Sequence, residues 1–136
     1  MSVLSYFDRV RIKSLEDILH GELIGAGMSQ AILTDVAGNI IAQFSSGDNT
    51  YDTSSLSILA ASNIGSLSAM SNIIGEDDFP LFILKGKRDN IHFTQISNDL
   101  FLITICNRNL SVGFVRRRID AALVSIKALV KHCNIP

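Results

Sequence analysis

The stretch that decides the fold, residues 31–44, reads AILTDVAGNIIAQF. Two apolar runs, 31–34 and 39–44, stand on either side of a short turn. In the turn, the Asp35 carboxylate can accept hydrogen bonds from the backbone that follows it, and Gly38 can take a positive φ at no steric cost. The stretch therefore predicts two strands joined as a β-hairpin.

A helix is predicted upstream of the hairpin. Residues 14–17 resemble a capping box, with Ser14 as the N-cap and Asp17 reaching back to it. Apolar residues then recur at helical spacing, at Leu15, Ile18, Leu19 and Leu23. The Gly-Ala-Gly run at 25–27 ends the helix. Residues 1–13 either extend this helix or precede it as an N-terminal arm.

Downstream of the hairpin, the pattern predicts a second helix, three more strands and a final helix. We expect them at 53–74, 81–85, 91–96, 100–106 and 111–132. A polar loop, 45–52, precedes the second helix, and Gly75 closes it as a C-cap. The last strand is apolar on both faces, which is typical of a central strand covered on both sides. We therefore expect a single domain, 1–136, with the element order α-β-β-α-β-β-β-α.

The composition narrows the class of protein. A length of 136 residues is enough for one domain with its own core, and 47% apolar residues argue against intrinsic disorder. The net charge is −1, although residues 108–136 carry six Lys and Arg against a single Asp. No stretch reaches the roughly 18 consecutive apolar residues of a membrane span. Asp8 interrupts the N-terminal apolar run, so we expect no signal peptide and a cytoplasmic protein.

The predicted second helix is unusual because residues 53–75 contain no charged side chain. At about 100° per residue, the larger apolar residues share one face: Leu56, Leu59, Leu67, Met70 and Ile74, with Ala60 and Ile64 at its edge. Small or compact residues share the adjacent face: Ser54, Ser57, Ala61, Gly65, Ser68 and Asn72. We expect the larger residues to pack on the sheet.

The face of small residues predicts a contact with another protein surface. A helix that faces water normally carries Lys, Glu or Arg, whereas Ser, Ala and Gly let another backbone approach closely. A second copy of the chain is the simplest partner, because two-fold dimers are the commonest oligomers. The alternative is an uncharged but solvated helix of a monomer. The apolar strand at 81–84 favours the dimer, since an unpaired edge strand of this kind invites aggregation.

Residues that carry enzymatic chemistry do not gather into a motif. His20, His92 and His132 are far apart in sequence, and we expect His92 to be an exposed or hydrogen-bonded strand residue. There is no phosphate-binding loop and no nucleophile motif. Cys106 and Cys133 lack zinc or redox spacing; a disulfide between them is one possibility, and two inert thiols are favoured. We predict no catalytic residue, no metal and no cofactor.

Arg116, Arg117 and Arg118 form a basic cluster on the predicted final helix. Such a cluster can contact RNA or an acidic protein surface, or it can simply face solvent. Phe114 alone does not make an aromatic platform for bases, so we predict no nucleic-acid partner.

In this order, the elements resemble the Roadblock (dynein light chain) family from about Leu15 to Lys131. Three features carry the resemblance: the hairpin with its Thr34-Asp35-x-x-Gly38 turn, the small-residue helix after a polar loop, and the three-strand meander followed by an amphipathic helix. The resemblance implies an α+β fold with a five-stranded antiparallel sheet of order 2-1-5-4-3. The central helix would lie on one face of that sheet, and the first and last helices on the other.

Members of this family are typically dimers in which the central helices pair and the third strands join edge to edge. With the composition of the helix, this implies an interface at Ser57, Ala61, Ile64, Gly65, Ser68, Asn72, Leu81 and Ile83. The resemblance is to prokaryotic gliding-motility regulators, and it implies a non-enzymatic homodimeric adaptor that binds and regulates a small Ras-like GTPase. The alternative is a light-chain or scaffold subunit that clamps a partner peptide independently of nucleotide. Neither reading involves insertion into a membrane.

Overall fold

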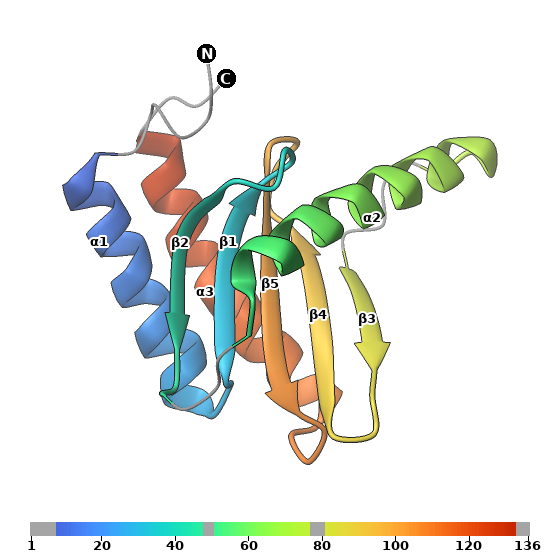
Figure 1. The fold of residues 1–136 in the computed structure, drawn as a ribbon. Coiled ribbons are helices and arrows are strands. Elements are labelled where there is room, and N and C mark those ends of the chain that lie inside the picture. The colour runs from blue at the N-terminus through green and yellow to red at the C-terminus, as the bar shows by residue number, and fades with distance from the viewer. Residues whose placement is uncertain (1–7, 48–50, 77–80, 133–136) are drawn as a thin grey trace.

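The middle strand of the sheet is β5 (Leu100–Asn107). In the computed structural model, which describes residues 8–47, 51–76 and 81–132, the five strands lie in the order β2-β1-β5-β4-β3 and all pairs are antiparallel (Figure 1). The other strands are β1 (Gln30–Asp35), β2 (Ile40–Ser45), β3 (Leu81–Lys85) and β4 (Asp89–Gln95). All of β5 is buried except its last residue. The expected sheet order and the expected central strand are confirmed.

The first helix, α1 (Arg9–Ile18), begins earlier than the sequence pattern predicts. Its N-cap is Asp8, whose carboxylate accepts a hydrogen bond from the backbone N–H three residues further on. Ser14 is therefore not the N-cap; it lies inside the helix, where its hydroxyl donates to the carbonyl four residues earlier at 3.1 Å. The Asp8 side chain satisfies one of the backbone N–H groups that the first turn of a helix leaves without a partner. The helix therefore starts directly after Asp8, and residues 9–13 belong to it and do not form a separate N-terminal arm. Residues 1–7 lie outside the described part of the chain.

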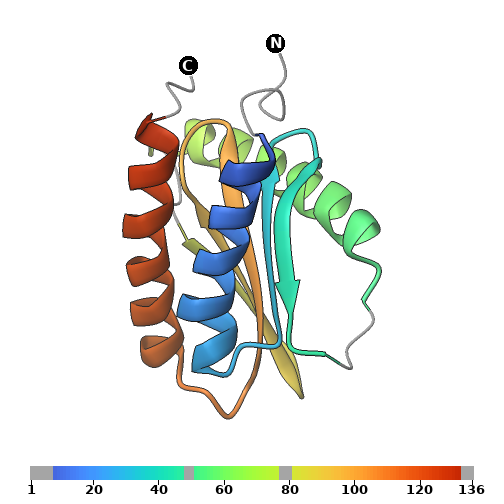
Figure 2. The same ribbon diagram turned by 90° about the vertical axis from the view of Figure 1, so that its left-hand side faces the viewer.

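Helices cover both faces of the sheet. After α1, the chain continues as a π-helical segment (Leu19–Leu23) and a 3₁₀ turn (Ile24–Ala26) before it enters β1. This first helix and α3 (Val112–His132) lie side by side on one face, while α2 (Thr53–Ile73) crosses the other (Figure 2). The expected distribution of helices is confirmed. Within the described residues, no helix has both the length and the apolar character needed to cross a lipid bilayer.

The sheet separates two apolar cores. The larger core lies between the sheet and the layer of α1 and α3, and its fully buried members include Leu15, Leu33, Leu102 and Ala122. The smaller core lies under α2 and contains Ile32, Ala60, Phe93, Phe101 and Ile103. Because side chains alternate along a strand, neighbouring residues of β5 belong to opposite cores.

Candidate protein-interaction surface

The turn between β1 and β2 positions the start of α2. The Asp35 carboxylate accepts two backbone hydrogen bonds, one of them from the N–H of Asn39 at 2.8 Å, as the turn motif predicts. Gly38 has a φ of 91°, and its carbonyl accepts a hydrogen bond from the Ser57 hydroxyl at 2.9 Å. A Cβ on Gly38 would lie 3.0 Å from the Cα of Ile58, so the glycine allows the helix to approach the turn this closely.

This contact corrects the predicted orientation of α2. Ser57 is fully buried against the turn, so it does not belong to a free face of the helix. Conversely, Leu59, Met70 and Ile74 were expected to pack on the sheet, and 67%, 52% and 66% of their surfaces are exposed. With no charged side chain on the helix, large apolar residues lie on several sides of it. Periodicity alone therefore does not identify the face that meets the sheet.

The remaining residues of the predicted interface lie on α2 and β3. Gly65 and Asn72 are exposed, and Ala61, Ile64, Ser68 and Ile83 are half-buried. The backbone of Leu81 pairs with Thr94 of β4. Ile83 stands in register with His92 and Thr104, whose row belongs to the side of the sheet that faces α3. The predicted interface residues are thus distributed over α2, on one side of the sheet, and over positions of the edge strand that belong to the other side.

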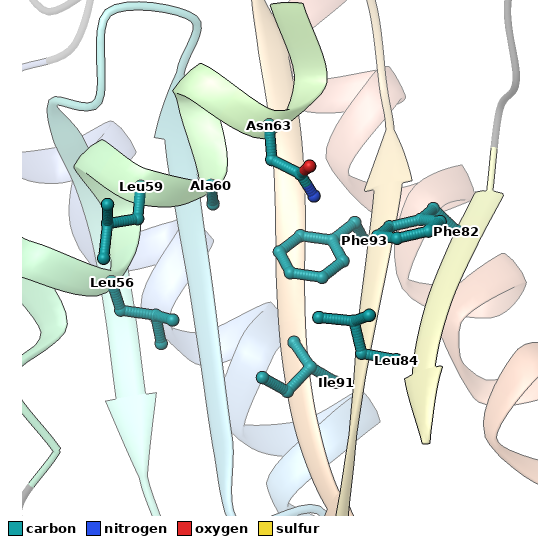
Figure 3. Close-up of a pocket in the computed structure, with 8 residues that line it drawn as sticks. All are labelled: Leu56, Leu59, Ala60, Asn63, Phe82, Leu84, Ile91 and Phe93. Carbon is teal, nitrogen blue, oxygen red and sulfur yellow. The ribbon is translucent and has the colours of Figure 1, made fainter. Parts of the chain in front are cut away.

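An open groove of about 380 Å³ lies between α2 and the hairpin of β3 and β4. It is lined by Leu56, Leu59, Ala60 and Asn63 of the helix and by Phe82, Leu84, Ile91 and Phe93 of the strands (Figure 3). The rings of Phe82 and Phe93 lie with their centroids 5.5 Å apart. Figure 3 shows the amide of Asn63 directed from the helix toward this groove. An exposed apolar groove of this kind is typical of a surface that another protein covers.

Two further features adjoin the groove. Within the described residues, β3 is an edge strand that pairs only with β4, so the backbone groups of its outer edge are available to another strand. The C-terminal part of α2 runs out past that edge (Figure 1). Ile73 and Ile74 lie there with 83% and 66% of their surfaces exposed. The groove, the edge and the projecting helix end together form the candidate surface.

The three arginines at 116–118 do not make one patch. Arg116 and Arg117 are exposed, whereas Arg118 is half-buried beside Glu22. One guanidinium nitrogen of Arg118 lies 3.2 Å from the Glu22 carboxylate, and its Nε donates to the Glu22 backbone carbonyl at 3.1 Å. Consecutive residues of a helix point about 100° apart, so a cluster in sequence spreads around the helix axis. Arg118 therefore links α3 to the end of the first helix.

His92 is buried, contrary to the prediction of an exposed or hydrogen-bonded strand residue. Its side chain lies on the α3 side of β4, and neither ring nitrogen has a hydrogen-bond partner within the described residues. The hydroxyls of Thr94 and Thr104, its neighbours on the same side of the sheet, are also buried without a partner there. Burial lowers the pKa of His92, so the imidazole is neutral at neutral pH.

Cys106 is a free, buried thiol, as predicted, and burial raises its pKa, which keeps it protonated and unreactive. Cys133 lies outside the described residues. Over residues 8–47, 51–76 and 81–132, no three His, Cys, Asp or Glu side chains come together as a metal-binding group. The groove and the outer edge of β3 offer apolar contact and strand pairing.

The sequence pattern predicts the strands that line the groove, but it does not predict the groove itself. The signal is present in the alternation of β3 and β4, which puts Phe82, Leu84, Ile91 and Phe93 on the same side of the hairpin. An apolar side of a β-hairpin must be covered by another layer of the same protein or by a partner. Only the position of α2 shows that the helix leaves part of this side open.

The chain is similar to known proteins at the level of its fold. No model of a protein family matches it, and a search of curated proteins also finds no match. Among solved structures, MglB of Myxococcus xanthus is similar with a TM-score of 0.87 and 23% identity, over 96% of this chain and 96% of that one. The gliding protein MglB of Thermus thermophilus is similar with a TM-score of 0.84 and 17% identity, over 93% of this chain and 95% of that one.

A more distant likeness points to the same fold. The Roadblock/LC7 domain from Streptomyces avermitilis is similar with a TM-score of 0.68 and 12% identity, over 83% of this chain and 98% of that one. The strand order and the layering of the helices are those that the resemblance to the Roadblock family implies. The chain therefore has the fold that MglB and Roadblock/LC7 domains share.

Proposed function

We propose that this chain is a homodimeric adaptor that binds and regulates a small Ras-like GTPase. The observation that carries the proposal is the adjoining groove, edge strand and projecting end of α2. These features belong to a fold whose solved examples include a protein described as a gliding protein. The chain is proposed to act through contacts, with no catalytic group of its own.

In the proposed dimer, the β3 strands of two copies pair edge to edge. The projecting end of α2 from each copy then lies over the hairpin of the other, where it fills the groove. Full burial of a large apolar side chain contributes about 1.5–3 kcal/mol, so Leu59, Ile73 and Ile74 supply a substantial driving force. Because α2 carries no charge, the two helices approach each other without burying an unpaired ion.

Two copies of α2, with the loops at their ends, would present a surface to the GTPase. Switch segments of such enzymes become ordered or disordered with the nucleotide state, and a partner that orders them changes the rate of the enzyme's own chemistry. We assign no arginine-finger role in this proposal. Arg118 is already engaged with Glu22 in the same chain.

The dimer is tested by light scattering on two matched variants. Leu59→Lys places a charge in the groove, and Val124→Lys places the same charge on α3 at a residue with similar exposure, 71% against 67%. We expect the wild-type chain and Val124→Lys to have the mass of two subunits, and Leu59→Lys to have the mass of one. A wild-type mass of one subunit at micromolar concentration would contradict the proposal.

The partner is tested by affinity capture from the native host lysate with GDP or a non-hydrolysable GTP analogue, followed by mass spectrometry. A small GTPase enriched in one nucleotide state supports the regulator, because state-selective binding is the mark of a coupled equilibrium. A scaffold or motor subunit retained in both states, with no GTPase, would instead favour a constitutive adaptor that clamps a partner peptide.

A further inference from the structure

A polar pocket of about 290 Å³ lies where α3 begins, on the side of the sheet opposite to α2. It is lined by Lys85, Gly86, Asn90, Arg108, Leu110, Ser111 and Val112. None of these lining residues is acidic, and two of them are cationic. The pocket shares no lining residue with the groove between α2 and the hairpin of β3 and β4.

The first turn of α3 offers backbone donors at the pocket, one from the lining residue Val112 and one from the residue that follows it. Ser111 is the N-cap: its hydroxyl accepts from the N–H of Phe114 at 3.1 Å, and its carbonyl accepts from the N–H of Val115 at 3.0 Å. Among the described residues, the N–H groups of Val112 and Gly113 have no such partner. A Cβ on Gly113 would meet nothing within 4 Å, so the approach to these donors is open. Free N–H groups at the start of a long helix favour an anion.

Asn90 adds a side-chain donor from the sheet. This residue is only 5% exposed, and it lines the pocket. The N–H of Gly86 donates to Oδ1 of Asn90 at 3.3 Å, which identifies the other end of the amide as nitrogen. Within the described residues this Nδ2 has no hydrogen-bond partner, yet it is not sealed from solvent, so it opens on the pocket. A nearly buried amide with a free donor points to a ligand that accepts hydrogen bonds.

Lys85 and Arg108 add positive charge. Lys85 pairs with Asn90, and Asn90 pairs with Cys106, so the three residues form one row on the side of the sheet that faces α3. Nη1 of Arg108 donates to the carbonyl of Lys87 at 3.0 Å, which holds the guanidinium beside the turn. Neither cation has an ion pair within the described residues.

A tight turn between β3 and β4 brings Lys85 and Asn90 side by side. The N–H of Gly86 donates to the carbonyl of Asp89 at 3.0 Å, and a Cβ on Gly86 would lie 2.5 Å from that oxygen. The carboxylate of Asp89 accepts a hydrogen bond from Tyr51 and pairs with Arg88, and Asp89 is not among the residues that line the pocket. The side chains that line the pocket therefore carry a net positive charge.

We propose that this pocket binds a tetrahedral oxyanion of the phosphate class. The anion accepts hydrogen bonds from the N–H groups of Val112 and Gly113 and from Nδ2 of Asn90, and Lys85 and Arg108 balance its charge. Phosphate presents several acceptor oxygens at once, which suits donors that converge from a helix and from a strand. The anion is either free phosphate or the phosphoryl group of a small ester, since both offer the same oxygens.

The test is a titration of the ¹⁵N-labelled protein with sodium phosphate at constant ionic strength, followed by NMR. We expect saturable shifts centred on the amides of Val112 and Gly113. Asn90→Asp keeps the oxygen that accepts a hydrogen bond from Gly86 but replaces the Nδ2 donor with a negatively charged oxygen. This change should weaken the binding of phosphate about tenfold or more. Asn98→Asp makes the same change in an exposed turn at the other end of β4 and should leave binding unchanged.

A second variant and a second probe complete the test. Lys85→Gln alters an exposed side chain and should also weaken binding, which covers the case in which Asn90→Asp does not fold. Glycerol 2-phosphate distinguishes the sources: tighter binding than inorganic phosphate assigns the site to a phosphoryl ester, and equal or weaker binding assigns it to the free ion. Shifts that do not saturate with either probe, or equal losses in Asn90→Asp and Asn98→Asp, would overturn the proposal.

Discussion

Two features of the structure, the backbone conformation and the close approach of α2, require a glycine at position 38. Its φ of 91° lies in the region that side chains disfavour, and a Cβ there would press on the backbone of Ile58. We therefore expect Gly38→Ala to destabilise the protein by about 1–3 kcal/mol, measured by urea denaturation. Gly113→Ala is the control, because its Cβ would meet open space in a helix; we expect no loss of stability. Equal effects of the two changes would contradict the role of Gly38.

His92 gives the protein a predictable response to acid. Because burial lowers its pKa, the unfolded chain binds a proton that the folded chain does not bind. Stability should therefore fall as the pH drops below the ordinary histidine value of 6.5 and should stop falling below the lowered pKa of the folded state. We expect His92→Leu to remove this part of the pH dependence in denaturation curves. His20→Leu, at an exposed position, should retain it.

Arg118 connects two elements that are far apart in sequence. It joins α3 to the segment that follows α1 through one ion pair and one hydrogen bond to Glu22. Since both side chains are partly exposed, we expect Arg118→Gln to cost about 1 kcal/mol of unfolding free energy. Arg117→Gln, at an exposed position on the same helix, should have no measurable effect. A stabilised Arg118→Gln would contradict this assignment.

The elements that sequence predicts well are those with local chemistry. The turn at Asp35 and Gly38 is readable because its hydrogen bonds lie within a few residues. The orientation of α2 is not readable in the same way, because a long-range contact between Ser57 and the turn determines it. The predicted start of α1 is wrong since both Asp8 and Ser14 are good capping residues, and the pattern does not rank them.

The candidate site is predicted only in outline. The absence of charge from residues 53–75 indicates that something covers the second helix, and the apolar strand at 81–84 indicates an edge that needs a partner. In the structure, the second helix and this edge strand lie next to each other. The groove and the polar pocket at α3 are not predictable in this way, because each is assembled from elements distant in sequence.

At the scale of the whole molecule, the proposed dimer links stability to concentration. If two copies fold as one unit, each tenfold rise in protein concentration adds about 1.4 kcal/mol to the stability of the dimer. We expect the Tm of the wild-type chain and of Val124→Lys to rise with concentration, and the Tm of Leu59→Lys to stay constant. A wild-type Tm that is independent of concentration would argue for a monomer.

The central place of β5 has a consequence for how the chain is made. Its two neighbours, β1 and β4, belong to hairpins that cannot join until β5, beginning at residue 100, is available. On the ribosome, the hairpin of β1 and β2 therefore keeps an unpaired inner edge until β5 is made, and the hairpin of β3 and β4 is completed only shortly before β5. The sheet closes only when β5 is made, and α3, which helps to cover it, follows β5 in the chain. Premature termination before β5 would consequently release fragments prone to aggregate, which a cell must remove by proteolysis.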